Sequence, residues 1–293
     1  IWKEGNTYFA KNSNGKIEFS GTDASQVINN ALNNGGKVYV KAGTYIITST
    51  IQVPSNSWLI GEGIDKTIFK LADNVNAPIL ENSDTTNGNT NIHIEGITFD
   101  LNGAKQTASN YVHLSKVGNS TLRNVKIING YTYVLFWESG VSDLDDAENS
   151  KNRYNIVENC IFDTSGLSGV AWDLAVFGGF INSIIKKCFF FNGAAYGLSV
   201  RFMKRTVIDS CVAVGNVYGF GLESVAFVTI KNNILHQNER DGIYIIDVSN
   251  IASHDIIIEG NIITENGVSA SVDGHGILVR NAYSIEITNN QCY

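Results

Sequence analysis

Charged side chains recur at one position of a strand phrase that is repeated in the second half of the chain. The phrase is a glycine followed by alternating residues, as in Gly197-Leu198-Ser199-Val200-Arg201 and Gly219-Phe220-Gly221-Leu222-Glu223. Successive side chains of a strand point to opposite faces, so the last residue of each phrase is expected on the outside. The outward column predicted in this way contains Glu138, Asp173, Arg201, Glu223, Ile246 and Arg280.

This charged row has two interpretations. In the first, it is a ladder of salt bridges between strands, worth about 0.2–1 kcal/mol per pair. In the second, it lines a catalytic groove in which Asp173 and Glu223 flank Arg201, with Lys204 and Arg205 in the following turn. An arginine that acts as a base needs an unusual environment, because the pKa of a guanidinium group lies above about 12.

A second cluster lies one residue before the repeated glycine. Its members are Ser168, Tyr196, Tyr218, Asp241 and His275. Asp241 and His275 belong to adjacent coils and are expected within reach of each other. Together with Asp247 and Asp273, Asp241 also leaves open a two-carboxylate hydrolase, in which the carboxylate separation decides between inverting and retaining outcomes. The alternative is a glycine-rich turn without catalysis.

Aromatic residues accompany both groups of charged side chains. An aromatic ring offers a sugar a flat apolar face with a polar edge, so these residues are candidates for stacking on a glycan. The alternative is that several of them are packed at the rim of the core. The candidates are Tyr131, Tyr133, Trp137, Tyr196, Tyr218 and Tyr244.

These residues must be positioned by a repeating architecture. Eight phrases of apolar–polar–turn character follow one another, and they are aligned on Gly96, Asn124, Cys160, Cys188, Cys211, Asn233, Asn261 and Asn290. The intervals range from 22 to 36 residues, and a drifting period of short β-rich runs is the signature of a stacked β-solenoid. The three aligned cysteines are expected to form a buried column, with a disulfide or a metal site as the alternatives.

The N-terminal region has the pattern of a cap. Asp23 is a good N-cap with Gln26 three residues later, and apolar residues from Ala24 to Leu32 recur at helical spacing before Gly35-Gly36 ends the helix. A solenoid has an open apolar end, which an amphipathic helix would cover. We therefore expect a lead-in and capping helix over residues 1–36 and coils over residues 37–293.

The first coils resemble a known superfamily. The residues that carry the resemblance are Asp23-Ala24, Ala31-Leu32, Gly35-Gly36-Lys37-Val38-Tyr39-Val40-Lys41-Ala42-Gly43-Thr44-Tyr45, Leu59-Ile60-Gly61-Glu62-Gly63 and Thr67-Ile68. They are similar to the N-terminal part of the pectate-lyase-like superfamily. This resemblance implies an all-β fold, a right-handed single-stranded parallel β-helix with a short N-terminal capping helix. Because one fold hosts many sites, it fixes the architecture better than the activity.

The superfamily includes pectate lyases, polygalacturonases, mannuronan epimerases and phage tailspikes. Its uronic-acid lyases use Ca²⁺ bound by Asp and Glu to neutralise the substrate carboxylate, while Arg or Lys removes the C5 proton. The resemblance thus implies a polysaccharide substrate and Ca²⁺ as a cofactor. Arg201, Asp173 and Glu223 would supply the residue types for this chemistry.

The diagnostic motifs of individual families are incomplete. Gly274-His275-Gly276 resembles a motif of polygalacturonase-type hydrolases, but their N-T-D, paired D-D and R-I-K motifs are missing. Tyr218-Gly219-Phe220 matches the first three residues of the Y-G-F-D-P-H motif of mannuronan epimerases, but Gly221-Leu222 replaces Asp-Pro. The sequence therefore leaves the reaction open between lyase, epimerase and hydrolase chemistry.

Composition excludes some functions. The chain has 293 residues and a formal net charge of −7, and it has no block of basic residues for phosphate contacts, which argues against nucleic acid as a partner. No run of about 18 apolar residues is present to span a membrane. The overall charge repels an acidic polysaccharide, so such a ligand would need a local basic patch or a bound cation.

These observations favour an extracellular or cell-surface protein that binds an extended, acidic polysaccharide in a groove on the outer face and acts on it. Residues 143–151 form an acidic insertion that would be either a groove wall or a solvated loop. The alternative is a structural or adhesive module, such as a fibre or a tailspike-like stalk. The repeat stops in mid-phrase at Tyr293, so further chain or another subunit is expected to pair with this end.

Overall fold

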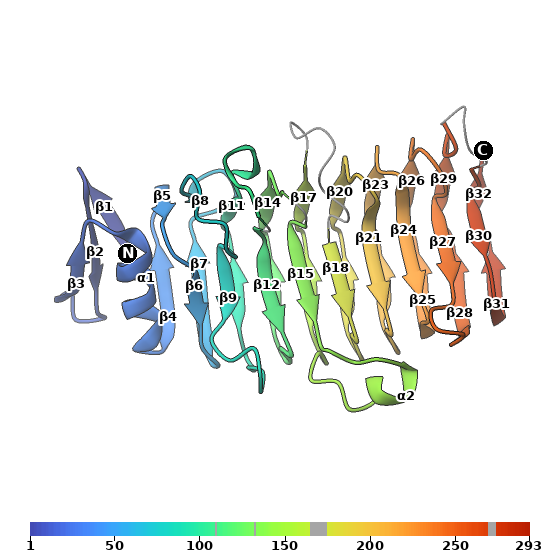
Figure 1. Ribbon diagram of the computed structural model, residues 1–293, viewed down its shortest axis with the longest axis horizontal. Helices are drawn as coiled ribbons and strands as arrows, with labels where there is room; N and C mark the ends of the chain where they lie inside the picture. The colour runs from blue at the N-terminus through green and yellow to red at the C-terminus, as the bar shows by residue number, and fades with distance from the viewer. Residues whose placement is uncertain (109, 132, 165–174, 269–273) are drawn as a thin grey trace.

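The protein forms one elongated stack of parallel coils in a computed structural model (Figure 1). The structure describes residues 1–108, 110–131, 133–164, 175–268 and 274–293. Each coil contributes strands to three long parallel sheets, which enclose a continuous apolar interior. The predicted all-β, right-handed parallel β-helix is confirmed. Within the described residues, no helix is long and apolar enough to cross a membrane.

The three sheets are named here in the order in which the chain visits them. Sheet 1 contains β4 (Gly36–Val40), β7 (Ser57–Gly61), β10 (His93–Glu95), β13 (Thr121–Arg123), β16 (Ile156–Glu158), β19 (Ile184–Lys186), β22 (Val207–Asp209), β25 (Ala226–Lys231), β28 (Ser253–Glu259) and β31 (Ala282–Thr288). Sheet 2 contains β5 (Gly43–Ile47), β8 (Thr67–Leu71), β11 (Thr98–Asp100), β14 (Lys126–Ile128), β17 (Ile161–Asp163), β20 (Phe189–Phe191), β23 (Val212–Val214), β26 (Ile234–His236), β29 (Ile262–Thr264) and β32 (Gln291–Cys292). Sheet 3 contains β6 (Ile51–Val53), β9 (Leu80–Asn82), β12 (Val112–Ser115), β15 (Leu135–Glu138), β18 (Ala175–Gly178), β21 (Tyr196–Arg201), β24 (Tyr218–Glu223), β27 (Ile243–Ile246) and β30 (Ile277–Val279).

Stacked aromatic residues fill part of the interior. The inward positions of sheet 2 place Tyr45, Phe69 and Phe99 in one column, with ring centroids 5.8 and 5.7 Å apart. Further along the column, Phe162 and Phe190 stack at 5.2 Å. Alternation along each short strand sends such residues inward, and the parallel register brings equivalent residues of neighbouring coils into contact.

The corner between sheets 1 and 2 explains the turn residues of the repeat. Its column of left-handed backbone conformations runs through Gly96, Asn124, Asn159, Lys187, Ser210, Asn232, Gly260 and Asn289. Glycine and asparagine adopt this conformation at low cost, which accounts for most members of the column. The next residue of each coil points inward, so Ile97 and Val125 lie in register with Cys160. The sequence alignment of Gly96 and Asn124 with Cys160 was therefore wrong by one residue in those two coils.

The inward column at this corner changes chemistry along the molecule. Cys160, Cys188 and Cys211 are buried free thiols, as the interpretation of a buried apolar column predicted. In the next coils the column continues as an asparagine ladder, in which the Asn233 side-chain amide donates to Asn261 Oδ1 at 2.9 Å and Asn261 donates to Asn290 Oδ1 at 2.8 Å. Buried amides stacked in this way satisfy one another's hydrogen bonds.

The outer face of sheet 1 carries a ladder of alternating charge. Arg123 Nε lies 3.1 Å from Glu158 Oε2, and Lys186 Nζ lies 3.1 Å from Glu158 Oε1. The strand register extends the alternation in both directions, and the full ladder is Glu95, Arg123, Glu158, Lys186, Asp209, Lys231 and Glu259. A structural ladder of alternating charge therefore lies on the outer face of sheet 1.

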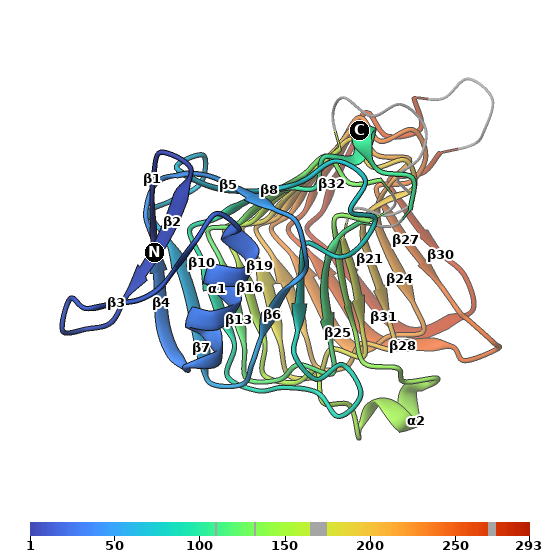
Figure 2. The ribbon, with the colours of Figure 1, turned by 60° about the vertical axis from the view of Figure 1, so that its left-hand side comes forward.

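The N-terminal end of the coils is covered by the predicted helix. The helix α1 (Ala24–Asn33) begins after Asp23, whose side chain accepts a hydrogen bond from the Ser25 amide at 2.9 Å. It buries Val27, Ile28 and Leu32 against the first coil, and Figure 2 shows it lying across that end. The antiparallel strands β1 (Trp2–Glu4), β2 (Thr7–Lys11) and β3 (Ile17–Gly21) pack beside it.

The acidic insertion forms a loop with a short helix, α2 (Leu144–Ala147), that projects from the lower side of the stack in Figure 1. Ala147 packs in a small separate apolar cluster with Ile181 and Phe202. Glu148, just after the helix, binds the guanidinium of Arg205 through both carboxylate oxygens at 2.8 and 2.7 Å. The insertion is therefore anchored to the coils instead of being a freely solvated charged run.

Candidate functional site

The charged row predicted on the outer face exists at the end of the sheet 3 strands, with one replacement. The register places Arg201 beside Glu223, and Glu223 beside Ile246. In the coil where Asp173 was expected, the strand is β18, and Gly178 pairs with Arg201. Asp173 itself lies outside the described residues. Gly178 therefore occupies the place in the row for which Asp173 was predicted.

Arg201 and Glu223 form the centre of this row. Arg201 Nε lies 2.6 Å from Glu223 Oε2, and its Nη2 also contacts that oxygen. The Glu223 side chain is only 11% exposed, whereas Arg201 is 52% exposed. The guanidinium is therefore held at the surface by a buried carboxylate, an arrangement that suits recognition of an anion better than proton abstraction.

This pairing bears on the expected calcium site. Glu223 Oε2 is engaged by Arg201, and Gly178 stands where a second carboxylate was expected. The described part of the chain also contains no group of three or more His, Cys, Asp or Glu residues placed to hold a metal ion. The residues of the row that the structure describes do not fit a calcium site, and no step of the chemistry is assigned to calcium.

Lys204 and Arg205 were predicted to bind substrate beside Arg201, but both are engaged by the α2 loop. Lys204 Nζ donates to Leu144 O at 3.0 Å and lies 2.9 Å from Glu148 Oε1. Glu148 also binds Arg205, and these hydrogen bonds, first from Arg205 and then from Lys204, lower its pKa to about 2. The two cations anchor the insertion, which leaves them unavailable as free groups of the predicted groove.

Three tyrosines form a platform next to the Arg201–Glu223 pair. Tyr218 stacks against both Tyr196 and Tyr244, with ring centroids 4.9 and 5.2 Å apart and interplanar angles of 28° and 23°. Tyr196 and Tyr244 are themselves 6.5 Å apart at 12°, so the three rings form a triangle of nearly parallel rings. Gly221 lies beneath this stack, since a Cβ atom there would approach Tyr196 Cδ1 to 2.5 Å. The platform presents aromatic faces and hydroxyl groups at a half-buried surface, as expected for a sugar-stacking site.

Basic groups surround the platform. Arg240 Nη1 donates to the Tyr218 hydroxyl at 2.6 Å, and the Arg240 guanidinium lies 5.4 Å from the Tyr218 ring centroid. Burial raises the pKa of Tyr244, while the nearby charge of Arg280 acts in the opposite direction. Arg240 and Arg280 therefore border one aromatic surface, and Glu223, the partner of Arg201, also acts on Tyr244.

Asp241 and His275 are in contact, as predicted from their places on adjacent coils. Asp241 Oδ1 accepts hydrogen bonds from both the backbone amide and Nδ1 of His275, each at 2.9 Å. The Asp241 side chain is 5% exposed and the His275 side chain 47% exposed. Because Nδ1 is engaged, Nε2 is the ring nitrogen that remains for a ligand.

Two other carboxylates were considered for a hydrolase. Asp247 accepts a hydrogen bond from the Asn281 side chain at 2.8 Å, and Asp273 lies outside the described residues.

Trp137 is a core residue and not a sugar platform. Its side chain is 1% exposed and packs against Phe177 and Phe180, with ring centroids 6.4 and 5.0 Å away. Strand alternation explains this position, because Leu135 and Trp137 point inward while Phe136 and Glu138 point outward. The predicted role of Trp137 in substrate binding was therefore wrong.

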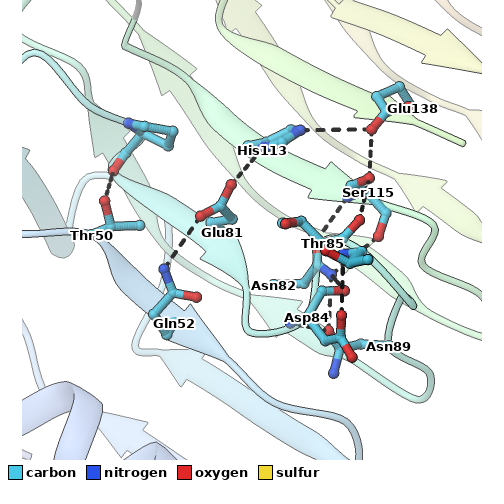
Figure 3. A network of polar contacts seen from close by, with 12 residues as sticks. Thr50, Gln52, Glu81, Asn82, Asp84, Thr85, Asn89, His113, Ser115 and Glu138 are labelled. Atoms are coloured by element: carbon cyan, nitrogen blue, oxygen red, sulfur yellow. Dashed lines mark hydrogen bonds and ion pairs between the residues drawn. The ribbon is translucent and has the colours of Figure 1, made fainter. Parts of the chain in front are cut away.

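Sequence reasoning missed a second cluster, near the N-terminal end of the same face (Figure 3). His113 Nδ1 lies 2.6 Å from Glu81 Oε1, and Gln52 Nε2 donates to Glu81 Oε2 at 3.3 Å. On the other side, His113 Nε2 lies 3.9 Å from Glu138 Oε1, which the Ser115 hydroxyl contacts at 2.5 Å. Glu138, predicted to bind substrate, thus belongs to this network and not to the Arg201 group.

Aromatic rings border this second cluster. Phe136 stacks on His113 with centroids 5.8 Å apart and on Tyr133 at 5.3 Å, and Tyr111 meets His113 edge-on at 5.5 Å. Burial, followed by the charge of Glu81, raises the pKa of Tyr111. Alternation in Leu80-Glu81 and Val112-His113-Leu114 could have placed Glu81 and His113 outside, but these coils lack the glycine phrase that directed the sequence search.

Comparison with known proteins agrees with this architecture. Residues 110–292 match the family described as "Right handed beta helix region". The chain belongs to the right-handed β-helix family.

Curated relatives of this β-helix protein are phage-related. It is 30% identical over 164 residues to the putative phage-related protein YobO of Bacillus subtilis (strain 168), a match that covers 51% of this chain and 20% of the relative. It is 31% identical over 108 residues to the pre-neck appendage protein of Bacillus phage phi29, covering 36% of this chain and 12% of the relative. The chain therefore spans a fifth or less of the length of these relatives.

Solved structures share the fold at low identity. The mannuronan C-5 epimerase AlgE4 A-module of Azotobacter vinelandii has a TM-score of 0.73 and 16% identity, covering 92% of this β-helix chain and 73% of the other. A tailspike protein variant of E. coli bacteriophage HK620, in complex with a pentasaccharide, has a TM-score of 0.71 and 16% identity, covering 97% of this chain and 56% of the other. At this identity the likeness concerns the fold alone.

Proposed function

We propose that this β-helix protein is part of an extracellular or virion-surface protein that binds an extended, acidic polysaccharide across the outer face of sheet 3. The observation that carries the proposal is the stack of Tyr196, Tyr218 and Tyr244 beside the exposed Arg201 guanidinium. Aromatic faces bind the sugar ring, and a guanidinium binds a carboxylate or another oxyanion through parallel hydrogen bonds.

The shape of the face supports a linear ligand. Sheet 3 runs along the length of the stack (Figure 1). Its two clusters both combine partly exposed aromatic rings with hydrogen-bonding side chains. The relatives add support of a general kind, because one is named as a phage appendage and one fold neighbour was solved with a pentasaccharide. A polymer that follows the helix axis would meet both clusters in turn.

The same face carries groups for acid–base chemistry on the glycan. His275 has Nδ1 engaged by Asp241, which leaves Nε2 as the nitrogen that takes or gives a proton. At His113, Glu81 engages Nδ1 and Nε2 faces Glu138 Oε1 at 3.9 Å, so a proton could pass between the ring and Glu138. Orientation of an imidazole by a carboxylate is how hydrolases hold their general base. We assign the lyase, epimerase or hydrolase step to these two pairs, in place of the Arg201 base considered from the sequence.

A binding and activity screen tests the proposal. Polyuronates and neutral glycans are titrated calorimetrically, and products are followed by unsaturated-uronate absorbance and reducing ends, with and without Ca²⁺. Tyr218→Ala and Arg201→Ala should each weaken binding about tenfold, whereas Tyr39→Ala, at an exposed tyrosine of sheet 1, should not. Equal glycan affinity in all three variants would show that the tyrosine platform is not the binding site.

A structural module is the second candidate, and the charge ladder on sheet 1 favours it. Seven alternating charges on consecutive coils stiffen a long stack without any ligand. A relative named as a pre-neck appendage agrees with such a role. If no glycan binds or is modified, while the protein remains a folded rod, this second function replaces the first.

A further inference from the structure

Three turns build a basic hollow at the corner between sheets 3 and 1. The turns lie between β9 and β10, between β12 and β13, and between β15 and β16, on three consecutive coils. The hollow has a volume of about 390 Å³ and is lined by Lys116, Lys151 and Arg153 together with Asn87 and Asn119. Asn89, which Figure 3 shows bonded to Asn82 and Asp84, also borders it.

The three cations of the hollow contact carbonyl groups. Lys116 Nζ donates to Thr86 O at 2.8 Å, and Lys151 Nζ donates to Asn87 O. Arg153 donates through Nε to Ser150 O at 2.8 Å and through Nη2 to Glu148 O at 2.5 Å. An ammonium group has three donors and a guanidinium five, so each cation retains N–H groups for a further acceptor.

No carboxylate side chain is among the described residues that line the hollow. The neighbouring acids have other hydrogen-bond partners, although one of them, Asp84, also lies within electrostatic reach of the hollow. Hydrogen bonds from Asn87 lower the pKa of Asp84, and the charge of Lys151 adds to this effect. Asp84 accepts from the amides of Thr86 and Asn87, Glu138 from Ser115, and Glu148 binds Arg205 and Lys204. Three positive charges without paired carboxylates are unexpected in a chain of net charge −7, because such charges repel one another unless an anion joins them.

The backbone is shaped so that these turns approach closely. A Cβ atom on Gly88 would lie 2.1 Å from Lys116 O, and one on Gly118 would lie 2.4 Å from Lys151 O. Glycine at both positions lets three coils pack at the spacing of about 4.8 Å that brings the cations together. Residues far apart in the sequence therefore form the local basic patch that an acidic ligand requires.

We propose that this hollow, bounded by Lys116, Lys151 and Arg153, binds an oxyanion, namely a carboxylate, sulfate or phosphate group carried by the polysaccharide. The inference rests on the proposed function for the identity of the carrier, and it adds a second contact point outside the tyrosine platform. Arg153 provides the planar fork for two oxygens, and the lysines act as point charges beside it.

Three polymers separate the anion from the sugar in the test. Polyphosphate carries anions without sugar, dextran carries sugar without anions, and dextran sulfate carries both. In calorimetric titrations, the double variant Lys151→Gln/Arg153→Gln should lose about tenfold or more in affinity for polyphosphate and dextran sulfate. The matched control Lys16→Gln/Lys66→Gln removes the same charge elsewhere and should stay within about twofold of the unmodified protein.

The outcomes separate this inference from the proposed function. Unchanged polyphosphate affinity in the double variant, or no binding of polyphosphate by the unmodified protein, overturns the oxyanion site. Loss of polyphosphate binding in the double variant but not in Tyr218→Ala supports the site, even if no glycan binds the tyrosines. Thermal unfolding of every variant shows whether the fold is retained.

Discussion

Two carboxylate–histidine pairs lie on the outer face of sheet 3, and they differ in which partner is buried. At the C-terminal pair, Asp241 is 5% exposed and His275 is 47% exposed. At the N-terminal pair, Glu81 is 25% exposed and His113 is 16% exposed. The histidines are six strands apart in the sheet, roughly 29 Å at about 4.8 Å per strand.

The same kind of carboxylate–histidine hydrogen bond therefore has a different role in each pair. A buried aspartate holds the exposed His275 ring toward solvent, where it can meet a ligand. The more buried His113 instead links side chains from four coils, from Gln52 through Glu81 to Glu138. The surrounding charges also differ. Arg240 lies beside Asp241 of the C-terminal pair, whereas His113 of the N-terminal pair lies between the carboxylates of Glu81 and Glu138.

The largest expected effect comes from removing the buried carboxylate of the C-terminal pair. Asp241→Ala leaves the His275 amide and Nδ1 without their shared acceptor, which should lower the free energy of unfolding by about 1–3 kcal/mol. Glu81→Ala, at the more exposed carboxylate, should cost less than about 1 kcal/mol. Urea unfolding of both variants measures the difference, and equal losses would contradict the contrast in burial.

Replacing the histidines should reverse the order, so that the N-terminal pair shows the larger loss of unfolding free energy. His113→Ala removes a ring that packs on Phe136 and bonds Glu81, so we expect a loss of about 1–2 kcal/mol in unfolding free energy. His275→Ala removes an exposed ring and should cost less than about 0.5 kcal/mol. The same urea titrations provide the measurement, and a larger loss at His275 would show that its exposed ring is more tightly packed than the structure indicates.

The tyrosine platform belongs only to the C-terminal region, so it can be disrupted separately. The methyl group of Gly221→Ala would press on Tyr196, and glycan affinity should fall by about three- to tenfold, or roughly 0.7–1.4 kcal/mol. Gly21→Ala is a suitable control, because its Cβ would meet Val27 at an ordinary 3.7 Å. Unchanged affinity in Gly221→Ala would place the glycan elsewhere on the face.

The smallest effect concerns the loop anchored beside the C-terminal region. Arg205 and Lys204 hold the pKa of Glu148 at about 2, below its ordinary value of 4.5. A carboxyl whose pKa is depressed on folding contributes stability above pH 4.5, and this contribution disappears as the pH falls toward 2. Because Glu148 is 46% exposed, the contribution should stay below about 1 kcal/mol.

Glu148→Gln should remove this acid-dependent contribution. Unfolding free energies measured at pH 7, 4 and 3 should fall less steeply in the variant than in the unmodified protein, with both proteins approaching each other at the lowest pH. A parallel decline in both proteins would show that the anchor does not contribute to acid sensitivity.

Most of the fold could be predicted because alternation and turn residues are local properties. They identified the coils, the inward columns, the helix over residues 24–33 and the approach of Asp241 to His275. Register is less secure, because one inserted residue moves a side chain to the other face. That is why Gly178 occupies the place expected for Asp173. Trp137 was instead proposed as a sugar platform from its residue type, although the outward position of Glu138 beside it already implied an inward side chain.

The remaining site residues could not be found from spacing, since coils of different length carry them. Glu81, His113 and Glu138 follow one another at unequal intervals and become neighbours only when the coils are stacked. Lys116, Lys151 and Arg153 show no block of positive charge in the sequence for the same reason. The paired state of Lys204 and Arg205 depends on the path of the α2 loop, which no local pattern specifies.

The alternating ladder on sheet 1 has a consequence for the length of the molecule. Deleting the coil that carries Lys186 would place Glu158 beside Asp209, and like charges directly opposite each other destabilise a sheet. Deleting two consecutive coils would restore an opposite-charge match at the new junction. Within the ladder, the stack therefore tolerates the gain or loss of two coils better than that of one coil, because only an even number keeps opposite charges next to each other.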